Sequence, residues 1–195
     1  MRFEIVVDAH ETPNKCTITP LAFRSDFRLF PVFGEGKIGP LSAPLLLHHE
    51  GECLTNLRQE LGRVPAIASI DCVWRRVAHL VAKTAWVDGV RPRLARIPDG
   101  FCTAYPRVGS PSTDPATGLA TIEALFIAAA LVGHYDPTLL ARYYFAERFI
   151  EINLRRFLDL GVGELADRKA WPTVAIPPRN AQSRRRNRGR SVPTR

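Results

Sequence analysis

The stretch Ala66-Ile67-Ala68-Ser69-Ile70 decides the fold class of the chain. Its small and apolar residues do not alternate with charged ones, which is typical of a strand that is buried on both faces of a parallel sheet. The run ends at Asp71, and apolar residues with helical spacing follow it: Val77, Leu80, Val81 and Trp86. We therefore expect a buried strand and then a helix.

The upstream sequence repeats this alternation. Phe3–Val7 is rich in β-branched residues and predicts a first strand. Pro44–Leu47 predicts another buried strand, which stops before the two histidines that follow it, and a helix is expected at 54–61. Residues 11–44 are rich in proline and glycine and predict loops with one short strand near Phe30–Phe33. Strands that alternate with helices indicate an α/β domain with a parallel sheet.

The second half of the sequence predicts helices. We therefore divide the chain into an α/β domain at 1–95 and a mainly helical domain at 96–175. One helix is expected at Leu119–Val132, where Gly133 can serve as a left-handed C-terminal cap. A second helix is expected at Asp136–Leu160, because an N-cap aspartate and a proline begin it and a broad apolar stripe follows.

The positive charge is concentrated at the end of the chain. The chain of 195 residues has a formal net charge of +8. Its last 20 residues contain no acid and seven arginines: Arg179, Arg184, Arg185, Arg186, Arg188, Arg190 and Arg195. The remaining residues are near neutrality, with 20 basic and 19 acidic side chains. We expect 176–195 to be a disordered tail that contacts phosphates without reading sequence, the alternative being a solubilising tail.

The cysteine spacing and the apolar stretches indicate the compartment. The four cysteines form no C-x-x-C pair, so a structural zinc site is not expected, and no other metal site is predicted. The sequence opens without the apolar stretch of a signal peptide, and Leu119–Val132 is too short to span a bilayer. We therefore expect a soluble, cytoplasmic protein with reduced thiols.

Asp71 and Trp74 are the first candidate site residues. The sequence has no P-loop, G-x-G-x-x-G, H-E-x-x-H or G-x-S-x-G motif, which argues against P-loop nucleotide hydrolysis and serine esterase chemistry. Asp71 follows a buried strand, where ligands of open α/β sheets bind, although it could equally cap the next helix. Trp74 could belong to the core or to a ligand-binding wall.

Other polar residues have ordinary structural interpretations when taken singly. Thr17 is a loop threonine, and the adjacent His48 and His49 cannot easily share one metal ion. Thr121 and Glu123 begin a helix, where capping is expected. Asn153 lies among apolar neighbours and must find hydrogen bonds, so it is expected to fasten a loop.

Six short segments, read in order, carry a resemblance to a known family. Pro13–Thr17 is similar to its D-P-K-x-C-T/S segment, with Thr12 in place of the acid, and Ile70–Trp74 is similar to its V-D-C-S-W segment. Ile97-Pro98 and Thr103–Pro106 resemble its L-P and A-A-N-P. Leu119–Ala124 and Phe149–Asn153 resemble its L-S-x-V-E-A and F-L-E-L-N. Over roughly residues 3 to 160 the chain thus resembles the SPOUT-like, knotted aminocarboxypropyltransferases that modify small-subunit ribosomal RNA.

The resemblance implies a fold and a cofactor. The family has a parallel-sheet α/β domain and a helical domain, and its chain forms a deep knot. S-adenosylmethionine would lie between the two domains. The main chain near Leu47 and Ile97 would hold its adenosine, Trp74 would pack near its methyl group, and Thr17 and Thr121 would hold its amino-acid end.

The resemblance also implies the reaction. The 3-amino-3-carboxypropyl group would be transferred to a pseudouridine of ribosomal RNA in a pre-ribosomal small subunit, during ribosome biogenesis. Asp71 is the candidate base, its alternative role being electrostatic. The residues expected to contact RNA are Lys15, Arg184, Arg185, Arg186, Arg188 and Arg190. A monomer is expected, with no membrane partner.

Departures from the family pattern leave other functions open. His49 stands at a family proline, Tyr105 stands at a family asparagine, and residues 107–118 lack the usual aromatic and basic content. The alternatives are aminocarboxypropyl or methyl transfer to a different RNA base, such as a transfer-RNA uridine, and a non-catalytic RNA-binding ribosome-assembly factor.

Overall fold

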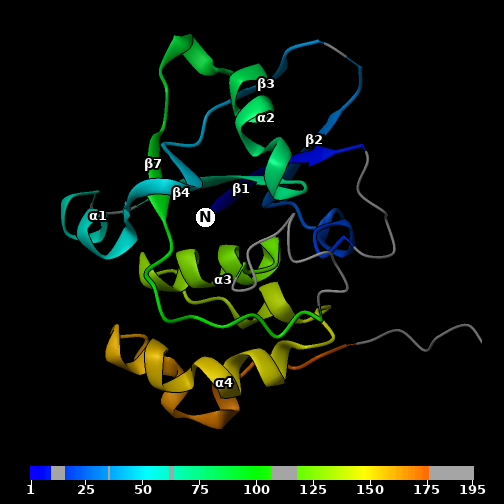
Figure 1. Ribbon diagram of the computed structural model, residues 1–195. Coiled ribbons are helices and arrows are strands. Elements are labelled where there is room, and N and C mark those ends of the chain that lie inside the picture. Colours follow the sequence, from blue (N-terminus) through cyan, green and yellow to red (C-terminus); the bar gives the residue numbers. More distant parts are fainter. Residues whose placement is uncertain (10–15, 35, 62–63, 107–117, 176–195) are drawn as a thin grey trace, which may run out of the picture.

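A five-stranded parallel sheet forms the centre of the molecule (Figure 1). The computed structural model describes residues 1–9, 16–34, 36–61, 64–106 and 118–175. Within these residues the strand order is β2-β1-β5-β4-β7. The bounds of these strands are Arg2–Asp8 for β1, Phe27–Val32 for β2, Leu45–Cys53 for β4, Ala66–Asp71 for β5 and Arg93–Arg96 for β7. The strand that decides the fold class, β5, is central, and all six of its residues are buried. The predicted parallel α/β sheet is confirmed.

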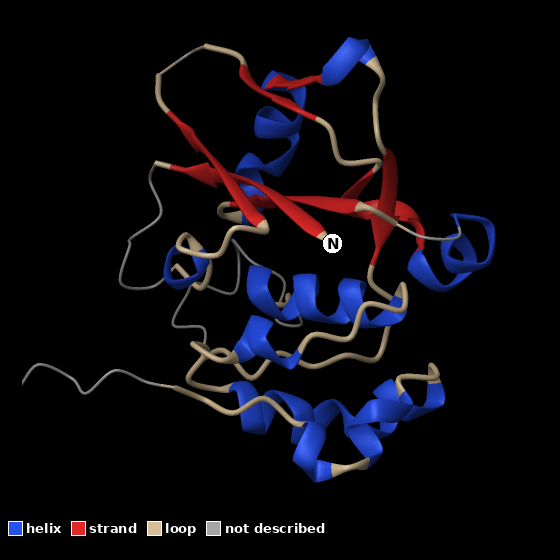
Figure 2. Cartoon of the chain, turned by 180° about the vertical axis from the view of Figure 1, so that it is seen from behind, coloured by secondary structure: helices blue, strands red, loops and turns tan. Residues whose placement is uncertain are grey.

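Helices cover both faces of this sheet. The helix α3 (Thr121–Leu131) packs under one face, and α4 (Ala146–Asp159) lies beyond it, which the view from behind also shows (Figure 2). On the other face, Val6, Leu46 and Ile70 pack with Leu80 of α2 (Val77–Lys83). The helix α1 (Leu54–Leu61) lies beside β4 and β7 at the edge of the sheet (Figure 1). Burial on both faces explains why the strand sequences do not alternate.

The described part of the first half contains three strands that the sequence did not predict. The described residues between 11 and 44 form two strands instead of one, because β3 (Ile38–Leu41) follows β2. β3 pairs with β6 (Thr84–Trp86), so Trp86 belongs to a strand and not to the preceding helix. Thr84 ends that helix, since its hydroxyl donates to the carbonyl of Leu80 at 2.8 Å. The third is β7, which pairs with β4.

The strand β4 is longer than predicted and is irregular. Ala95 of β7 pairs with Leu47 and again with Glu52, so the residues between these two bulge away from the sheet. Gly51 lies in this bulge, where a Cβ atom would come within 2.5 Å of the main chain of Leu94 and Ala95. The strand therefore does not stop at the histidines. It carries them out of the sheet and then returns to β7.

The first predicted helix of the second half is confirmed, and the second is wrong in part. α3 ends as expected, with Gly133 at φ +81° and the His134 amide donating to Ala129 at 2.8 Å. Asp136 caps only a 3-10 helix, Pro137–Leu140, by accepting from Thr138, and α4 begins at Ala146. The chain turns between these helices, which lets the Tyr143 hydroxyl donate to Glu123. The apolar stripe is therefore divided between two elements that pack on the same core, and it does not form one continuous helix.

The hydrophobic core is continuous across the expected boundary at residue 95. Phe3 and Ile67 of the sheet belong to the same cluster as Phe126 and Phe149 of the helical half. The division at residue 95 and the deep knot both stay predictions. The tail at 176–195 lies outside the described residues. Within the described residues, no helix is long and apolar enough to cross a membrane.

Candidate functional site

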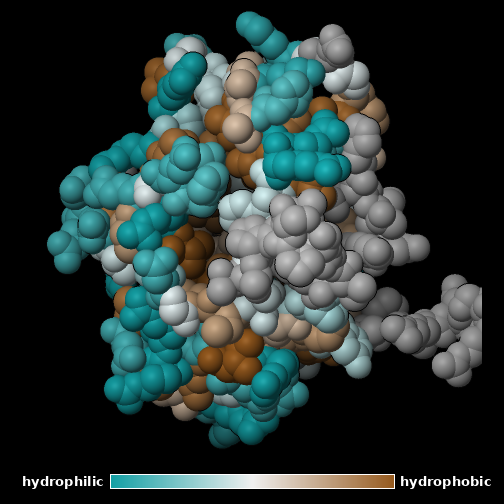
Figure 3. All heavy atoms as spheres, in the orientation of Figure 1, coloured by the Kyte–Doolittle hydropathy of each residue, from teal (hydrophilic) through white to brown (hydrophobic). Residues whose placement is uncertain are grey.

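A cleft of about 1140 Å³ lies between the sheet and the amino-terminal end of α3. Its walls come from β4, β5, the segments after β5 and β7, the Cys16–Thr17 segment and the start of α3. Hydrophobic side chains gather in a hollow on this face of the molecule (Figure 3). Ligands of open parallel sheets bind beyond the carboxyl ends of the strands. The cleft therefore lies where the sheet topology favours a ligand.

Asp71, the last residue of β5, holds a fixed carboxylate in the cleft wall. It is only 7% exposed. The Thr121 hydroxyl donates to Oδ1 at 2.6 Å, and the Cys16 thiol donates to Oδ2 at 2.9 Å. Asp71 thus joins three segments of the cleft and does not cap the helix after its own strand. Both of its oxygens accept hydrogen bonds, so the position of its charge is fixed.

Cys16 and Thr17 connect the amino-terminal segment to this carboxylate and to α3. Burial raises the pKa of the Cys16 thiol above its ordinary value, and the neighbouring Asp71 charge raises it further. The thiol therefore stays protonated and donates its hydrogen to Asp71. The Ile122 amide lies 3.4 Å from the Thr17 hydroxyl, which accepts from the first turn of α3.

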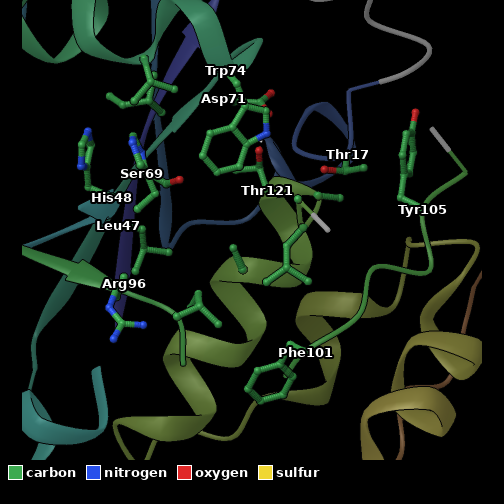
Figure 4. Close-up of a pocket in the computed structure, with 18 of the residues that line it drawn as sticks. Thr17, Leu47, His48, Ser69, Asp71, Trp74, Arg96, Phe101, Tyr105 and Thr121 are labelled. Atoms are coloured by element: carbon green, nitrogen blue, oxygen red, sulfur yellow. Dashed lines mark hydrogen bonds between the residues drawn. The ribbon is translucent and has the colours of Figure 1, made fainter. Parts of the chain in front are cut away.

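Trp74 and two histidines form an aromatic wall. The rings of His48 and His49 stack with centroids 4.5 Å apart, and His49 meets Trp74 edge-on at 5.6 Å. Burial lowers the pKa of His48, and His49 lowers it further, so its imidazole favours the neutral form. Figure 4 shows Trp74 close to Asp71 and Thr121, with His48 and Arg96 on one side of them and Thr17 and Tyr105 on the other. The β4 bulge is what carries the histidines to this wall.

The opposite wall, residues 97–106, is held by two buried polar side chains of the helical layer. Asn153 of α4 accepts from the Cys102 amide at 2.7 Å and donates to the Cys102 carbonyl at 2.8 Å. Glu123 of α3 accepts from the Ala104 amide at 2.8 Å and from the Thr103 hydroxyl at 2.6 Å. The expectation that Asn153 fastens a loop is confirmed.

Glu123 also caps α3, as predicted. It accepts from the Ala120 amide at 2.8 Å, which is half of a capping box, and Ala120 has no side-chain oxygen to complete the other half. Thr121, in contrast, uses its hydroxyl on Asp71 and not on the main chain of its own helix. Thr121 and Glu123 lie in the same helical turn, but Thr121 bonds to Asp71 of the sheet wall and Glu123 bonds to the wall formed by residues 97–106.

The cleft brings together six residues named from the sequence: Thr17, Leu47, Asp71, Trp74, Ile97 and Thr121. Lys15 and the arginines of the tail lie outside the described residues. Sequence reasoning gave Cys16 and Arg96 no role of their own, although both line the cleft. The thiol at position 16 is 55 residues from Asp71, and no local pattern indicates their contact. Among the described residues, no group of three histidine, cysteine, aspartate or glutamate side chains could hold a metal ion.

Comparison with known proteins finds a likeness of the fold and none of the sequence. No family model matches the sequence, and no curated protein matches it significantly. The fold is similar to that of a solved structure, the SAM-dependent rRNA:acp-transferase Tsr3 from Vulcanisaeta distributa. The two chains share 20% sequence identity over 85% of each, with a TM-score of 0.54. At this identity the likeness concerns the fold alone, and the shared fold is an α/β fold with a parallel sheet and a helical layer.

Proposed function

We propose that the protein transfers the 3-amino-3-carboxypropyl group of S-adenosylmethionine to a base of ribosomal RNA. What carries the proposal is that the six residues named from the sequence resemblance line one cleft, although they come from five separate segments. The likeness of the fold to the SAM-dependent rRNA transferase Tsr3 supports it. A pseudouridine acceptor, a role in ribosome biogenesis and a knotted SPOUT-like chain belong to the same proposal.

The residues of the cleft fit this cofactor. Ligand pockets commonly enclose about 300 to 1,000 Å³. At about 1140 Å³, the cleft has room for the cofactor and for a nucleotide beside it. Leu47, Ile70 and Ile97 offer apolar walls for an adenine ring. The Asp71 carboxylate and the Trp74 ring both favour a cation between them.

Each residue then has a specific task. The main chain at Leu47 and Ile97 would hold the adenosine, and Thr17 and Thr121 would orient the amino-acid end. Trp74 would cover the methyl group, which leaves the aminocarboxypropyl carbon facing the acceptor. Bound S-adenosylmethionine would supply an electrophilic carbon and a neutral thioether leaving group, so that a ring nitrogen of the acceptor could replace the sulfur and release its proton to Asp71 or to water.

The hydrogen bonds of Asp71 favour an electrostatic role for this residue. A carboxylate that accepts from Thr121 and Cys16 has part of its lone-pair capacity already engaged. Its charge is nevertheless held in place in a water-poor wall, where it acts more strongly on a neighbouring sulfonium than it would in water. Its assignment as the catalytic base stays a prediction. In either role, Asp71→Asn would impair the reaction.

The acceptor would be brought to the cleft by cationic groups. Lys15 and the tail arginines (Arg184, Arg185, Arg186, Arg188 and Arg190) would contact phosphates, and a pre-ribosomal small subunit would be the partner. Such contacts raise affinity without choosing the base. The choice of base would therefore be made in the cleft.

Calorimetric titration of the full chain with S-adenosylmethionine tests the cofactor. We expect binding that Trp74→Ala and Asp71→Asn weaken at least tenfold, a loss of about 1.4 kcal/mol. Asp88→Asn is the matched control, because Asp88 is exposed and does not line the cleft. If the unaltered chain does not bind S-adenosylmethionine, the enzymatic proposal is wrong.

Mass spectrometry of small-subunit ribosomal RNA, after incubation with protein and cofactor, tests the reaction. The aminocarboxypropyl and methyl groups differ in mass, so the product identifies the transferred group. A methyl product would replace the proposal with methyl transfer. RNA that binds regardless of the cofactor and stays unmodified would indicate a non-catalytic assembly factor.

A further inference from the structure

Two exposed aromatic side chains lie outside the cleft, one in contact with Arg142 and the other two residues further along the chain from this arginine. Phe23 is 66% exposed and Tyr144 is 67% exposed. The guanidinium carbon of Arg142 lies 4.2 Å from the centroid of the Phe23 ring. We call these residues, together with Phe145, the Phe23–Tyr144 surface. Core packing does not explain why two large rings face water here.

This surface is continuous with the cleft. Tyr105 lines the cleft, on the side where Figure 4 also shows Thr17. The Tyr105 ring meets Phe145 edge-on at 6.1 Å, and Phe145 meets Tyr144 edge-on at 4.9 Å. A row of aromatic rings therefore leads from the wall of the cleft to the exposed surface.

The surface is held in a fixed geometry by Arg24, the neighbour of Phe23. Arg24 donates to Asp26 at 2.8 and 2.9 Å, and to Asp136 at 2.7 Å and Thr138 at 2.6 Å. These bonds join the segment before β2 to the segment that leads into Arg142. The position of Phe23 relative to Arg142 is thus set before any partner binds, which reduces the cost of ordering on binding.

The charge beside these rings is suited to an anionic partner. Within the described part of the chain, no carboxylate lies within ion-pair distance of Arg142. The last described residue, Ala175, donates its amide to the carbonyl of Ala141 at 2.7 Å. The described part of the chain therefore ends beside the residue that precedes Arg142, and the 20 residues that follow in the sequence contain seven arginines.

We propose that the Phe23–Tyr144 surface binds a single-stranded segment of RNA next to the nucleotide that enters the cleft. Two bases stack on Phe23 and Tyr144, and Arg142 contacts a phosphate between them. Aromatic rings interspersed with an arginine suit single-stranded RNA, because every base offers a face for stacking. The inference rests on the proposed function in one respect, namely that RNA is what enters the cleft.

Binding of a fluorescein-labelled single strand of twelve uridines, measured by anisotropy with the full chain, tests this inference. We expect the double variant Phe23→Ala, Tyr144→Ala to bind this RNA roughly tenfold more weakly. The double variant Phe23→Tyr, Tyr144→Phe keeps both rings and should bind like the unaltered protein. Heparin, a polyanion without bases, should bind all of these proteins equally.

Phe33→Ala is the matched control, since Phe33 is 78% exposed but lies at the end of β2, away from these residues. Melting curves establish that each variant folds. The inference is overturned if the double alanine variant binds the RNA within twofold of the unaltered protein, or if Phe33→Ala weakens binding as much. It is also overturned if sedimentation shows a dimer that the double alanine variant abolishes, because the surface would then join two copies of the chain.

The two proposals fail separately. Cofactor binding in the calorimeter, together with RNA binding that ignores the surface, would remove only this inference. RNA binding that depends on the surface, without any cofactor binding, would instead remove the proposed enzyme activity and keep the RNA surface.

Discussion

Replacing Glu123 with glutamine tests how the cleft wall is held. The Glu123 side chain is fully buried. Its Oε1 accepts from the Ala104 amide and the Tyr143 hydroxyl, both at 2.8 Å. Its Oε2 accepts from the Thr103 hydroxyl at 2.6 Å and the Ala120 amide at 2.8 Å. One carboxylate thus serves four donors, two of which are main-chain amides.

The expected loss of stability follows from this arrangement. A glutamine has one acceptor oxygen and one donor group, and the Thr103 and Tyr143 hydroxyls can rotate to suit either orientation. In both orientations, however, one main-chain amide faces the glutamine NH₂ group: Ala120 in one and Ala104 in the other. One charge-assisted bond is lost, a buried N–H is left without a partner, and the remaining bonds become neutral. Together these effects cost about 3 kcal/mol.

Thermal unfolding followed by circular dichroism measures this loss. For a chain of this size, about 3 kcal/mol corresponds to a fall in Tm of about 6 to 12 °C. The control is Glu147→Gln, because Glu147 is an exposed glutamate of α4 whose ion pair with Arg168 should contribute less than about 1 kcal/mol. The reasoning would be refuted if the Tm of the Glu123→Gln protein lay within about 2 °C of the Tm of the Glu147→Gln protein, because the expected loss corresponds to a larger shift.

Three further predictions concern other parts of the molecule. Iodoacetamide should alkylate the exposed Cys102 well before Cys16, because the Cys16 thiol is buried and its pKa is raised. Asp71→Asn should speed the alkylation of Cys16, since it removes the neighbouring charge. Peptide mass spectrometry measures both rates, and equal rates for the two thiols would contradict this account. Burial raises the pKa of Asp136, but hydrogen bonds from Thr138 and Arg24 outweigh burial and hold this pKa below the ordinary 3.8. The ionised Asp136 therefore stabilises the fold at pH values above 3.8, and this stabilisation is lost as the pH falls through the lower pKa of the folded state. Arg24→Gln should therefore lower the free energy of unfolding by roughly 2 to 3 kcal/mol near pH 7. It should also make the free energy of unfolding depend less on pH in acid, which urea unfolding at several pH values can measure. An unchanged pH profile would contradict this prediction. Deleting residues 180–195 should weaken RNA binding and flatten its salt dependence while cofactor binding stays intact, and an unchanged salt slope would show that the tail is not the anchor.

The elements that depend on local pattern could be predicted from the sequence. The buried run Ala66–Ile70 predicted the central strand, because a strand that is covered on both faces has to be apolar throughout. Gly133 ended its helix as expected, since it adopts a positive φ of 81°. The polar Asn153 in an apolar stripe correctly indicated a bonded loop, because a buried amide must find partners.

The features that depend on distant contacts could not be predicted. The apolar stripe of the second predicted helix continues through Tyr143, but the chain turns there and the Tyr143 hydroxyl donates to Glu123, which is 20 residues away in the sequence. The bulge of β4 depends on β7, a strand that the sequence did not reveal at all. The bond between Cys16 and Asp71 likewise joins residues that the sequence keeps far apart. The residues of the cleft were therefore found through a family likeness, and their contacts were found only in the fold.

The way in which Cys102 and Ala104 are fastened has a consequence for how this site can change over time. A strand in a ladder repeats its pairing at every residue, so a substitution or a deletion in it disturbs its neighbours. Here the wall at 97–106 is fixed at separate points by Asn153 and Glu123, which form hydrogen bonds with its main chain and with the Thr103 hydroxyl. The Tyr105 ring is held in another way, since it packs edge-on against Phe145. A substitution at position 105 would therefore change this packing and the lining of the cleft, and would leave in place the bonds that fix the main chain at Cys102 and Ala104.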